Sequence, residues 1–137
     1  MQRKILNSLS VLLFFSMILF SCQQSVRNPF QENLEAGSIN GSFHMPGYKV
    51  WGASVIRHED GKYYMFVSIW PTTDSANWIT HSQVALAISD KPEGPYQFEK
   101  IVLPFRERAY WDGMMSHNPT IHKHEDNYYL FYIGTTF

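Results

Sequence analysis

One stretch decides the fold: HEDGKYYMFVSI, at residues 58–69. It has a near copy in HEDNYYLFYIG, at residues 124–134, in which the pair of tyrosines recurs 65 residues later. The Asp-Gly of the first copy is a strong signal for a β-hairpin turn. The aromatic run that follows it is apolar on both faces, which is typical of a strand covered on both sides. The sequence therefore predicts two similar hairpins, each with an aromatic returning strand.

Further strands are predicted around the first hairpin. Residues 54–57 lead into its turn, residues 83–89 (QVALAIS) form a third strand, and residues 96–103 form a fourth, more exposed strand. A rigid turn, DKPEGP at residues 90–95, separates the last two. No convincing amphipathic helix lies between these strands, and residues 119–122 restart the pattern. Four short antiparallel strands per repeat, with aromatic residues at a fixed place, are typical of a β-propeller blade; a β-sandwich with two similar hairpins is the alternative.

The repeat accounts for about one and a half blades. A propeller needs at least four blades to close around its channel, whereas the 137-residue sequence holds one complete blade and the first hairpin of another. We therefore expect an all-β fold in which residues 43–137 are the N-terminal part of a truncated propeller domain. Such a fragment is expected not to fold stably alone, because its blade faces would remain exposed.

The first residues are typical of a secretion signal. A positively charged start at residues 3–4 precedes an apolar stretch at residues 11–20. This stretch is shorter than the roughly 20 apolar residues that a membrane span needs. The tetrapeptide LFSC at residues 19–22 resembles the bacterial lipobox, in which the Cys is lipidated and becomes the mature N-terminus. A transmembrane anchor or a buried helix is the alternative.

The expected lipid anchor sets the organisation and the location of the chain. Residues 1–21 form the predicted lipoprotein signal peptide with its signal helix, and Cys22 carries the lipid. Residues 22–42 are polar and form a flexible tether. Gln23 resembles the residue found in lipoproteins that are sorted onward. We therefore expect a cell-envelope lipoprotein, at the outer membrane or cell surface of a Gram-negative bacterium, with the membrane as one partner.

Composition excludes several classes of function. The 11 Lys and Arg against 12 Asp and Glu give a formal net charge of −1, which argues against a nucleic-acid partner because such a partner requires a basic surface. The single Cys excludes an internal disulfide framework and a multi-Cys metal site. His122 and His124 are predicted to face water, and the sequence has neither a His-Glu-x-x-His motif nor a phosphate-cradling loop. We therefore expect no metal and no cofactor, while the oligomeric state stays open.

The blade pattern resembles the five-bladed β-propeller glycosidases around glycoside hydrolase family 43. Those proteins share a hairpin of the form dGkYYLyyS, matched here at residues 60–68, and a strand and turn of the form A-x-S-x-x-x-x-GP-[FWY], matched by AISDKPEGPY at residues 87–96. The resemblance covers residues 50–137. It implies a partial five-bladed propeller, a carbohydrate partner, and three carboxylates at the channel: an Asp base, an Asp that tunes pKa and a Glu acid. Glycoside hydrolysis needs two carboxyl groups because one protonates the leaving oxygen while another activates water.

The sequence departs from that family where the base is expected. The family's base Asp belongs to an Asp-Pro pair that opens the first strand of the first blade, and the matching residues here are Gly52 and Ala53. The same place in the second repeat holds Asn118. Neither Gly nor Asn can act as a general base. Asp112 is the one acid close by, in the loop that enters the second repeat, and it is our candidate catalytic residue; an Asp-Gly turn without function is the alternative.

Aromatic and polar residues gather near the same place in both repeats. Such residues suit a sugar site, because aromatic rings stack on the sugar while polar groups fix its hydroxyls. The predicted substrate-binding residues are Trp51, Trp111, His117, Asn118, Trp70 and His81. Trp51 and the His117-Asn118 pair are expected to line one funnel. Trp70 and His81 are assigned to a long loop between the second and third strands, which either closes over substrate or covers the surface; inter-blade packing is the alternative for Trp51.

Two classes of function follow. The first is a glycoside hydrolase-like protein that acts on the non-reducing-end sugar of a polysaccharide or oligosaccharide, with its general acid in blades outside this sequence, so that the fragment itself is inactive. The second is a non-catalytic glycan-binding propeller lipoprotein, which Gly52 and Asn118 favour. A propeller glycoside phosphorylase would require a cluster of Arg and Lys near the sugar, for which Arg106 and Arg108 are the only local candidates.

Overall fold

A computed structural model of the chain describes residues 41–73 and 75–136. All of them belong to the second of the two units into which the chain divides, Gly37–Phe137. The predicted signal peptide, the lipidation site at Cys22 and most of the predicted tether lie outside the described residues. Within the described ranges, no helix has the length and apolar character needed to cross a membrane.

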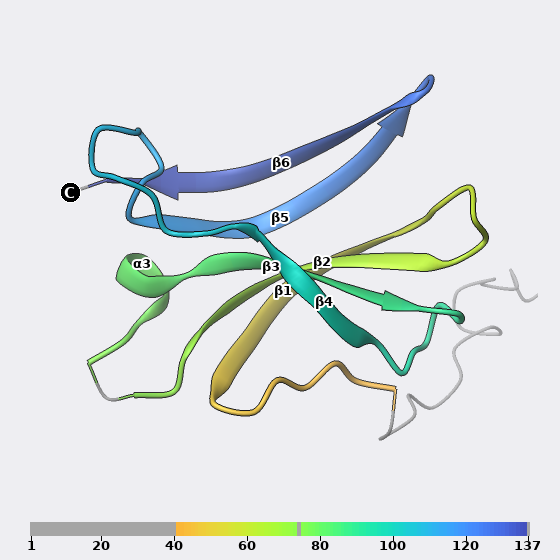
Figure 1. Cartoon of the computed structure of the whole chain (residues 1–137), viewed down its shortest axis with the longest axis horizontal. Coiled ribbons are helices and arrows are strands. Elements are labelled where there is room, and N and C mark those ends of the chain that lie inside the picture. Colours follow the sequence, from red (N-terminus) through yellow and green to blue (C-terminus); the bar gives the residue numbers. More distant parts are fainter. Residues whose placement is uncertain (1–40, 74, 137) are drawn as a thin grey trace, which may run out of the picture. The chain divides into compact units, whose positions relative to one another are not determined.

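The described chain is all-β, as predicted. The elements are β1 (Tyr48–Arg57), β2 (Tyr63–Pro71), α3 (Trp78–His81), β3 (Gln83–Ser89), β4 (Gln97–Leu103), β5 (Met115–His124) and β6 (Asn127–Thr135). The first four strands form one antiparallel sheet in the order β1-β2-β3-β4, and β5 pairs with β6 in a second sheet (Figure 1). The two predicted hairpins are thus β1–β2 and β5–β6.

The hairpin strands are longer than predicted because each first strand contains a β-bulge. β1 begins at Tyr48 rather than residue 54, and its register shifts between Trp51 and Ser54. β5 begins at Met115 rather than residue 119, and its register shifts between His117 and Thr120. A bulge inserts an extra residue and bends the strand without ending it. The two bulges occupy the same place in the repeat.

Left-handed backbone at Gly52 and Asn118 produces these bulges. Their φ angles are 60° and 48°, and Gly and Asn are the residues that adopt this conformation most readily. A Cβ at position 52 would lie 2.9 Å from Oδ1 of Asn118, so a side chain there would displace the Asn118 amide. The glycine at the position of the expected Asp is therefore favoured by the local backbone.

The segment between β2 and β3 differs from the prediction in two ways. Trp70 and Pro71 belong to β2 and pair with β1, so they are not part of a loop. A four-residue helix, α3, follows, capped by Asn77, whose Oδ1 accepts hydrogen bonds from the backbone N–H groups of Ile79 (2.9 Å) and Thr80 (3.1 Å). Sequence analysis indicated no amphipathic helix, and this single turn, which has no buried residue, is too short to show a helical period.

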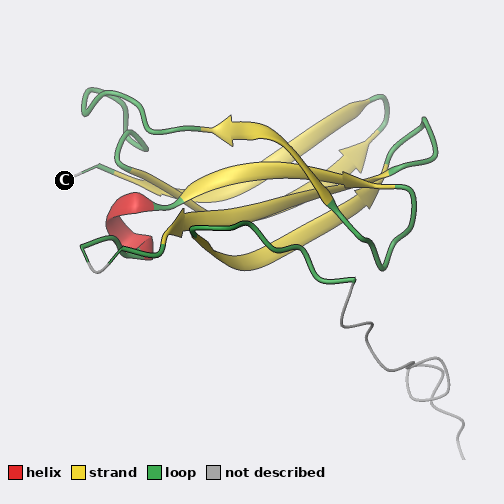
Figure 2. Cartoon of the chain, turned by 60° about the horizontal axis from the view of Figure 1, so that its bottom comes forward, coloured by secondary structure: helices red, strands yellow, loops and turns green. Residues whose placement is uncertain are grey.

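The two faces of the first sheet have different roles because side chains alternate along each strand. On one face, Val67, Ile69 and Ala85 are fully buried, and partly buried apolar side chains from the strands and from residues 43–47 pack against them. The opposite face receives β5. Figure 2 shows the strands, with the single described helix at one end of them. Ser68 Oγ accepts a hydrogen bond from the backbone N–H of Asn118 (2.9 Å). These contacts hold the second hairpin against the first sheet.

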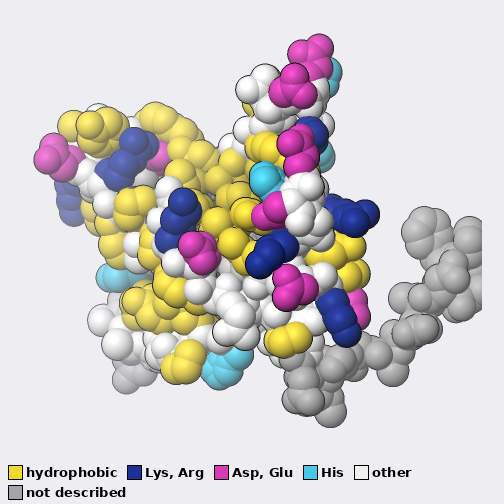
Figure 3. Space-filling model, turned by 45° about the vertical axis from the view of Figure 1, so that its right-hand side comes forward, with side chains coloured by type: hydrophobic (Ala, Val, Ile, Leu, Met, Phe, Trp, Pro, Cys, Tyr) yellow, Lys and Arg dark blue, Asp and Glu magenta, His cyan; other side chains and the backbone are white. Residues whose placement is uncertain are grey.

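Large apolar side chains remain exposed on the outer face of the second hairpin. Tyr129, Phe131 and Ile133 alternate along β6 and are 46%, 60% and 54% exposed. Figure 3 shows hydrophobic side chains over a broad area of one side of the molecule, with charged side chains interspersed. Monomeric proteins rarely leave a large contiguous apolar surface open.

Candidate functional site

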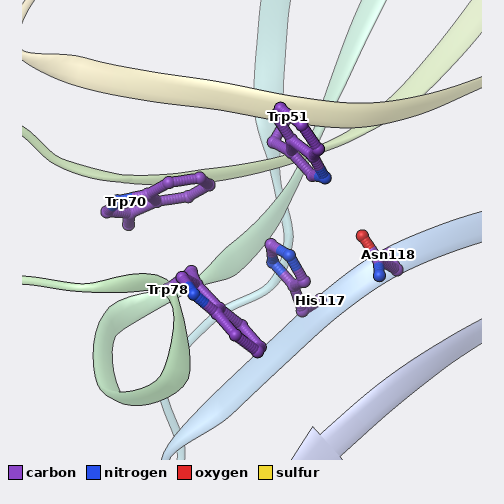
Figure 4. A pocket seen from close by; sticks show the side chains of 5 residues that line it. All are labelled: Trp51, Trp70, Trp78, His117 and Asn118. Carbon is purple, nitrogen blue, oxygen red and sulfur yellow. The ribbon is translucent and has the colours of Figure 1, made fainter.

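One pocket combines aromatic side chains of the first sheet and α3 with polar side chains of the second sheet. It has a volume of about 380 Å³ and is lined by Trp51, Trp70, Trp78, His117 and Asn118 (Figure 4). The three indoles come from β1, β2 and α3, whereas the two polar side chains come from β5. Sequence analysis placed Trp51, Trp70, His117 and Asn118 among the candidate substrate contacts, and the structure brings these four together.

The strand alternation directs two of the tryptophans into the pocket. Trp70 lies two residues after Ser68, so both side chains point to the face that receives β5. Trp51 pairs with Ser68 across the β1–β2 ladder and immediately precedes the bulge, which places it on the same face. Its side chain is 63% exposed, although it is one of the largest apolar groups in the chain. An indole held open beside a cavity is available to a ligand.

His117 is the buried polar group of the pocket. Its side chain is only 4% exposed, and its Nδ1 lies 2.7 Å from Oγ of the fully buried Ser82. Its ring contacts the rings of Trp70 and Trp78, with centroids 5.7 and 5.1 Å apart. Burial lowers the pKa of His117 below its ordinary value. The imidazole is therefore neutral near pH 7, so that it can offer a hydrogen bond without a charge.

Asp112, the candidate catalytic residue, is not one of the side chains that line this pocket. Its carboxylate is 2% exposed and is bound by the Arg106 guanidinium and by the hydroxyl of Tyr132, which donates a hydrogen bond of 2.6 Å. Burial alone raises the pKa of Asp112, but the bonds from Tyr132 and Arg106 outweigh it, so the pKa is lowered overall. An ionised carboxylate with both oxygens engaged is a poor general acid, and this geometry favours a structural role.

Two other predicted contacts also lie away from the pocket. Trp111 is 60% exposed and stacks on the ring of Tyr132, with centroids 5.6 Å apart. The ring of His81 contacts Phe105, and its Nδ1 lies 2.6 Å from Oγ1 of Thr80. Neither side chain lines the cavity.

Trp78 lies in the segment that the sequence assigned to the long loop, and it lines the pocket although it was not among the six predicted contacts. It is the first residue of α3, and the N-cap bonds of Asn77 fix the turn that carries it. Asn77 could have indicated the position of Trp78, since Asn is a preferred N-cap residue and predicts that a helix starts at the next residue. A helix start at this point turns Trp78 toward the pocket rather than leaving it in a surface loop.

The chemistry of the pocket is stacking and neutral hydrogen bonding. Within residues 41–73 and 75–136, no Asp, Glu, Lys or Arg side chain lines it, so the pocket supplies no acid–base pair of its own. The phosphorylase alternative depended on Arg106 and Arg108, and neither lines the pocket. The guanidinium of Arg106 is paired with Asp112 and lies over the ring of Tyr110 at 4.4 Å. Among the described residues, no group of three His, Cys, Asp or Glu side chains could hold a metal ion.

Comparison with known proteins adds no identity, because no protein-family model and no curated protein matches this sequence.

Proposed function

We propose that this chain binds the non-reducing-end sugar of a glycan in the three-tryptophan pocket, as part of a glycoside hydrolase-like β-propeller lipoprotein of the cell envelope. The observation that carries the proposal is the pocket's composition: three indoles and an uncharged polar pair, drawn from both repeats, around about 380 Å³. A sugar ring has apolar C–H faces and a rim of neutral hydroxyls. Indole faces match the former, and imidazole and amide groups match the latter. The volume lies within the roughly 300–1,000 Å³ of ordinary ligand pockets.

Two features support the propeller part of the proposal. The first sheet is a meander of four antiparallel strands in consecutive order, and the first strand of the next hairpin packs on its face. The exposed row on β6, Tyr129 to Ile133, also corresponds through the 65-residue repeat to the row on β2, Tyr64 to Ser68, that β5 covers. A further hairpin of the same kind would therefore bury the exposed row as β5 buries its counterpart.

Whether the protein hydrolyses the glycan or only binds it depends on the presence of catalytic carboxyl groups at the pocket. Hydrolysis would require a pair of carboxyl groups from residues other than those that line the pocket, because no Asp or Glu is among the lining side chains. A non-catalytic glycan-binding protein is the second candidate. It is favoured by Gly52, which stands where the family's base Asp is expected and whose left-handed backbone disfavours residues with a side chain.

A calorimetric titration tests the binding proposal. The full chain is titrated with neutral pentoses and hexoses, with a uronic acid and with choline. We expect at least one neutral sugar to bind and choline not to bind. Three tryptophans can also form an aromatic cage for a quaternary ammonium ion through cation–π contacts. Choline binding without sugar binding would refute the sugar proposal and would indicate a site for a quaternary ammonium ion. Release of sugar from chromogenic glycosides separates the hydrolase from the binding protein.

The lipid anchor has its own test. Incorporation of a labelled fatty acid in a Gram-negative host should depend on Cys22, and the Cys22→Ser variant should remain unlabelled. Equal labelling of both proteins would refute the anchor without affecting the sugar-binding proposal.

A further inference from the structure

We infer that Asn118 is the specificity-determining residue of the pocket: its side-chain amide reads a pair of neighbouring sugar hydroxyls, and Gly52 positions that amide. The inference rests on the proposed sugar binding and adds the group that selects among sugars. It is carried by three features of the two bulges, which are the backbone conformation of Asn118, its bond to Ser68, and the missing side chain at Gly52.

The backbone of Asn118 is fixed independently of any ligand. Its φ of 48° is left-handed, and its N–H donates a hydrogen bond of 2.9 Å to Oγ of Ser68, a residue with no exposed surface. The next residue is Pro119, whose ring further restricts this segment of β5. The backbone that carries the Asn118 side chain is therefore rigid, whereas the side chain is exposed at the pocket.

Gly52 brings the amide close to β1. A Cβ at residue 52 would lie 2.9 Å from Oδ1 of Asn118 and 3.9 Å from its Cγ. The absent side chain thus leaves the space that the Asn118 amide occupies, next to Trp51. The bulge of β1 and the bulge of β5 thus lie close together at the pocket. Gly52 is a positioning residue, and it acts on the sugar only through Asn118.

The chemistry of the lining groups assigns the selective role to Asn118. Each indole offers a single N–H donor and no acceptor. His117 has one ring nitrogen occupied by Ser82, which leaves one nitrogen for a ligand. A primary amide presents a carbonyl acceptor and an NH₂ donor side by side, a pair that matches two neighbouring hydroxyls. A site that hydrogen-bonds a hydroxyl discriminates against an analogue lacking it. Because Asn118 is exposed, water can pair with the amide when a hydroxyl is missing, so we expect a modest discrimination.

Asn118→Gly is the main test. This variant removes the amide but keeps a residue that accepts left-handed backbone, so we expect it to fold at least as stably as the wild type. The binding of one neutral sugar and of its monodeoxy derivatives is measured by calorimetry for the full chain. Asn127→Gly, which changes an exposed residue outside the pocket, is the matched control.

The expected result is a loss of discrimination. The wild type and Asn127→Gly should bind the parent sugar about 5–10-fold more tightly than the derivative that lacks a hydroxyl facing Asn118, whereas Asn118→Gly should bind the two within about 2-fold. Gly52→Ala should reduce the same discrimination, because the added methyl group displaces the amide. If Asn118→Gly discriminates between the two sugars as the wild type does, the inference is overturned and the sugar-binding proposal is unaffected. A wild type that binds no sugar overturns the proposed function and the inference together.

Discussion

Replacement of Asp112 by Asn distinguishes a structural carboxylate from a catalytic one. Asn has the same shape but no charge, and only one of its two terminal atoms can accept a hydrogen bond. In the folded chain the Asp112 carboxylate accepts from both Arg106 and Tyr132, so one donor must lose its acceptor. Hydrogen bonds to a charged group contribute about 1.5–3 kcal/mol. Because the Arg106 side chain is 40% exposed and can turn to water, we expect a destabilisation of about 1–2 kcal/mol.

Thermal unfolding followed by circular dichroism measures this effect. A loss of about 1–2 kcal/mol lowers Tm by about 4–16 °C for a domain of this size. Asp90→Asn is the matched control. Its carboxylate is 85% exposed and lies 3.6 Å from Nζ of Lys62, and such exposed pairs contribute about 0–1 kcal/mol. We expect Asp90→Asn to unfold close to the wild type, while sugar affinity is unchanged in both variants at temperatures where they are folded.

Two results would refute the reasoning about Asp112. If Asp112→Asn unfolds with the same Tm as Asp90→Asn, the bonds to Arg106 and Tyr132 do not stabilise the fold. If it keeps its stability but loses sugar binding or turnover, Asp112 contacts substrate, as the sequence alone suggested.

Three further predictions concern the core, the pocket histidine and the short helix. Ile69→Ala should destabilise the chain by about 2–5 kcal/mol, since Ile69 is fully buried, whereas Ile133→Ala, at a side chain that is 54% exposed, should cost far less in the same urea titration. Because burial lowers the pKa of His117, the unfolded chain takes up a proton first as pH falls; the stability from this residue should be fully present above about pH 6.5 and should decrease from there down to the lowered pKa. Urea midpoints measured across that window should fall more steeply in the wild type than in His117→Gln. Asn77→Ala removes the N-cap of α3 and should cost about 0.5–2 kcal/mol; it should also weaken sugar binding by displacing Trp78, and unchanged affinity in calorimetry would show that the helix does not position that ring.

The sequence predicted those parts of the fold that depend on local signals. The hairpins follow from a turn and an aromatic run within about a dozen residues, so they could be read directly. The strand ends could not, because Gly52 and Asn118 resemble breakers and yet form bulges inside continuous strands. Pro71 likewise resembled a loop residue, although it ends β2.

The repeat in the sequence predicted several residues of the candidate site. The role of Asp112 was not predicted, because it depends on residues that contact it only in the folded chain. Trp51 in β1 corresponds to His117 in β5, and Gly52 corresponds to Asn118. The repeat therefore predicted that Trp51, His117 and Asn118 lie near one another. Asp112 lies in the turn before β5, and its role depends on Arg106 and on Tyr132, which follows 20 residues later in β6. No local pattern indicates that this carboxylate is turned into the protein.

The four tryptophans of the chain provide the most direct test of the central claim, that the three-tryptophan pocket binds a sugar. Each indole N–H gives one signal in a ¹H–¹⁵N spectrum, assigned through single Trp→Phe variants of the full chain. Trp51, Trp70 and Trp78 line the pocket, whereas Trp111 stacks on Tyr132 outside it. On titration with the sugar that binds most tightly in calorimetry, we predict saturable shifts of the first three signals and a stationary Trp111 signal. A shift of Trp111 alone, or four stationary signals at saturating sugar, would contradict the account.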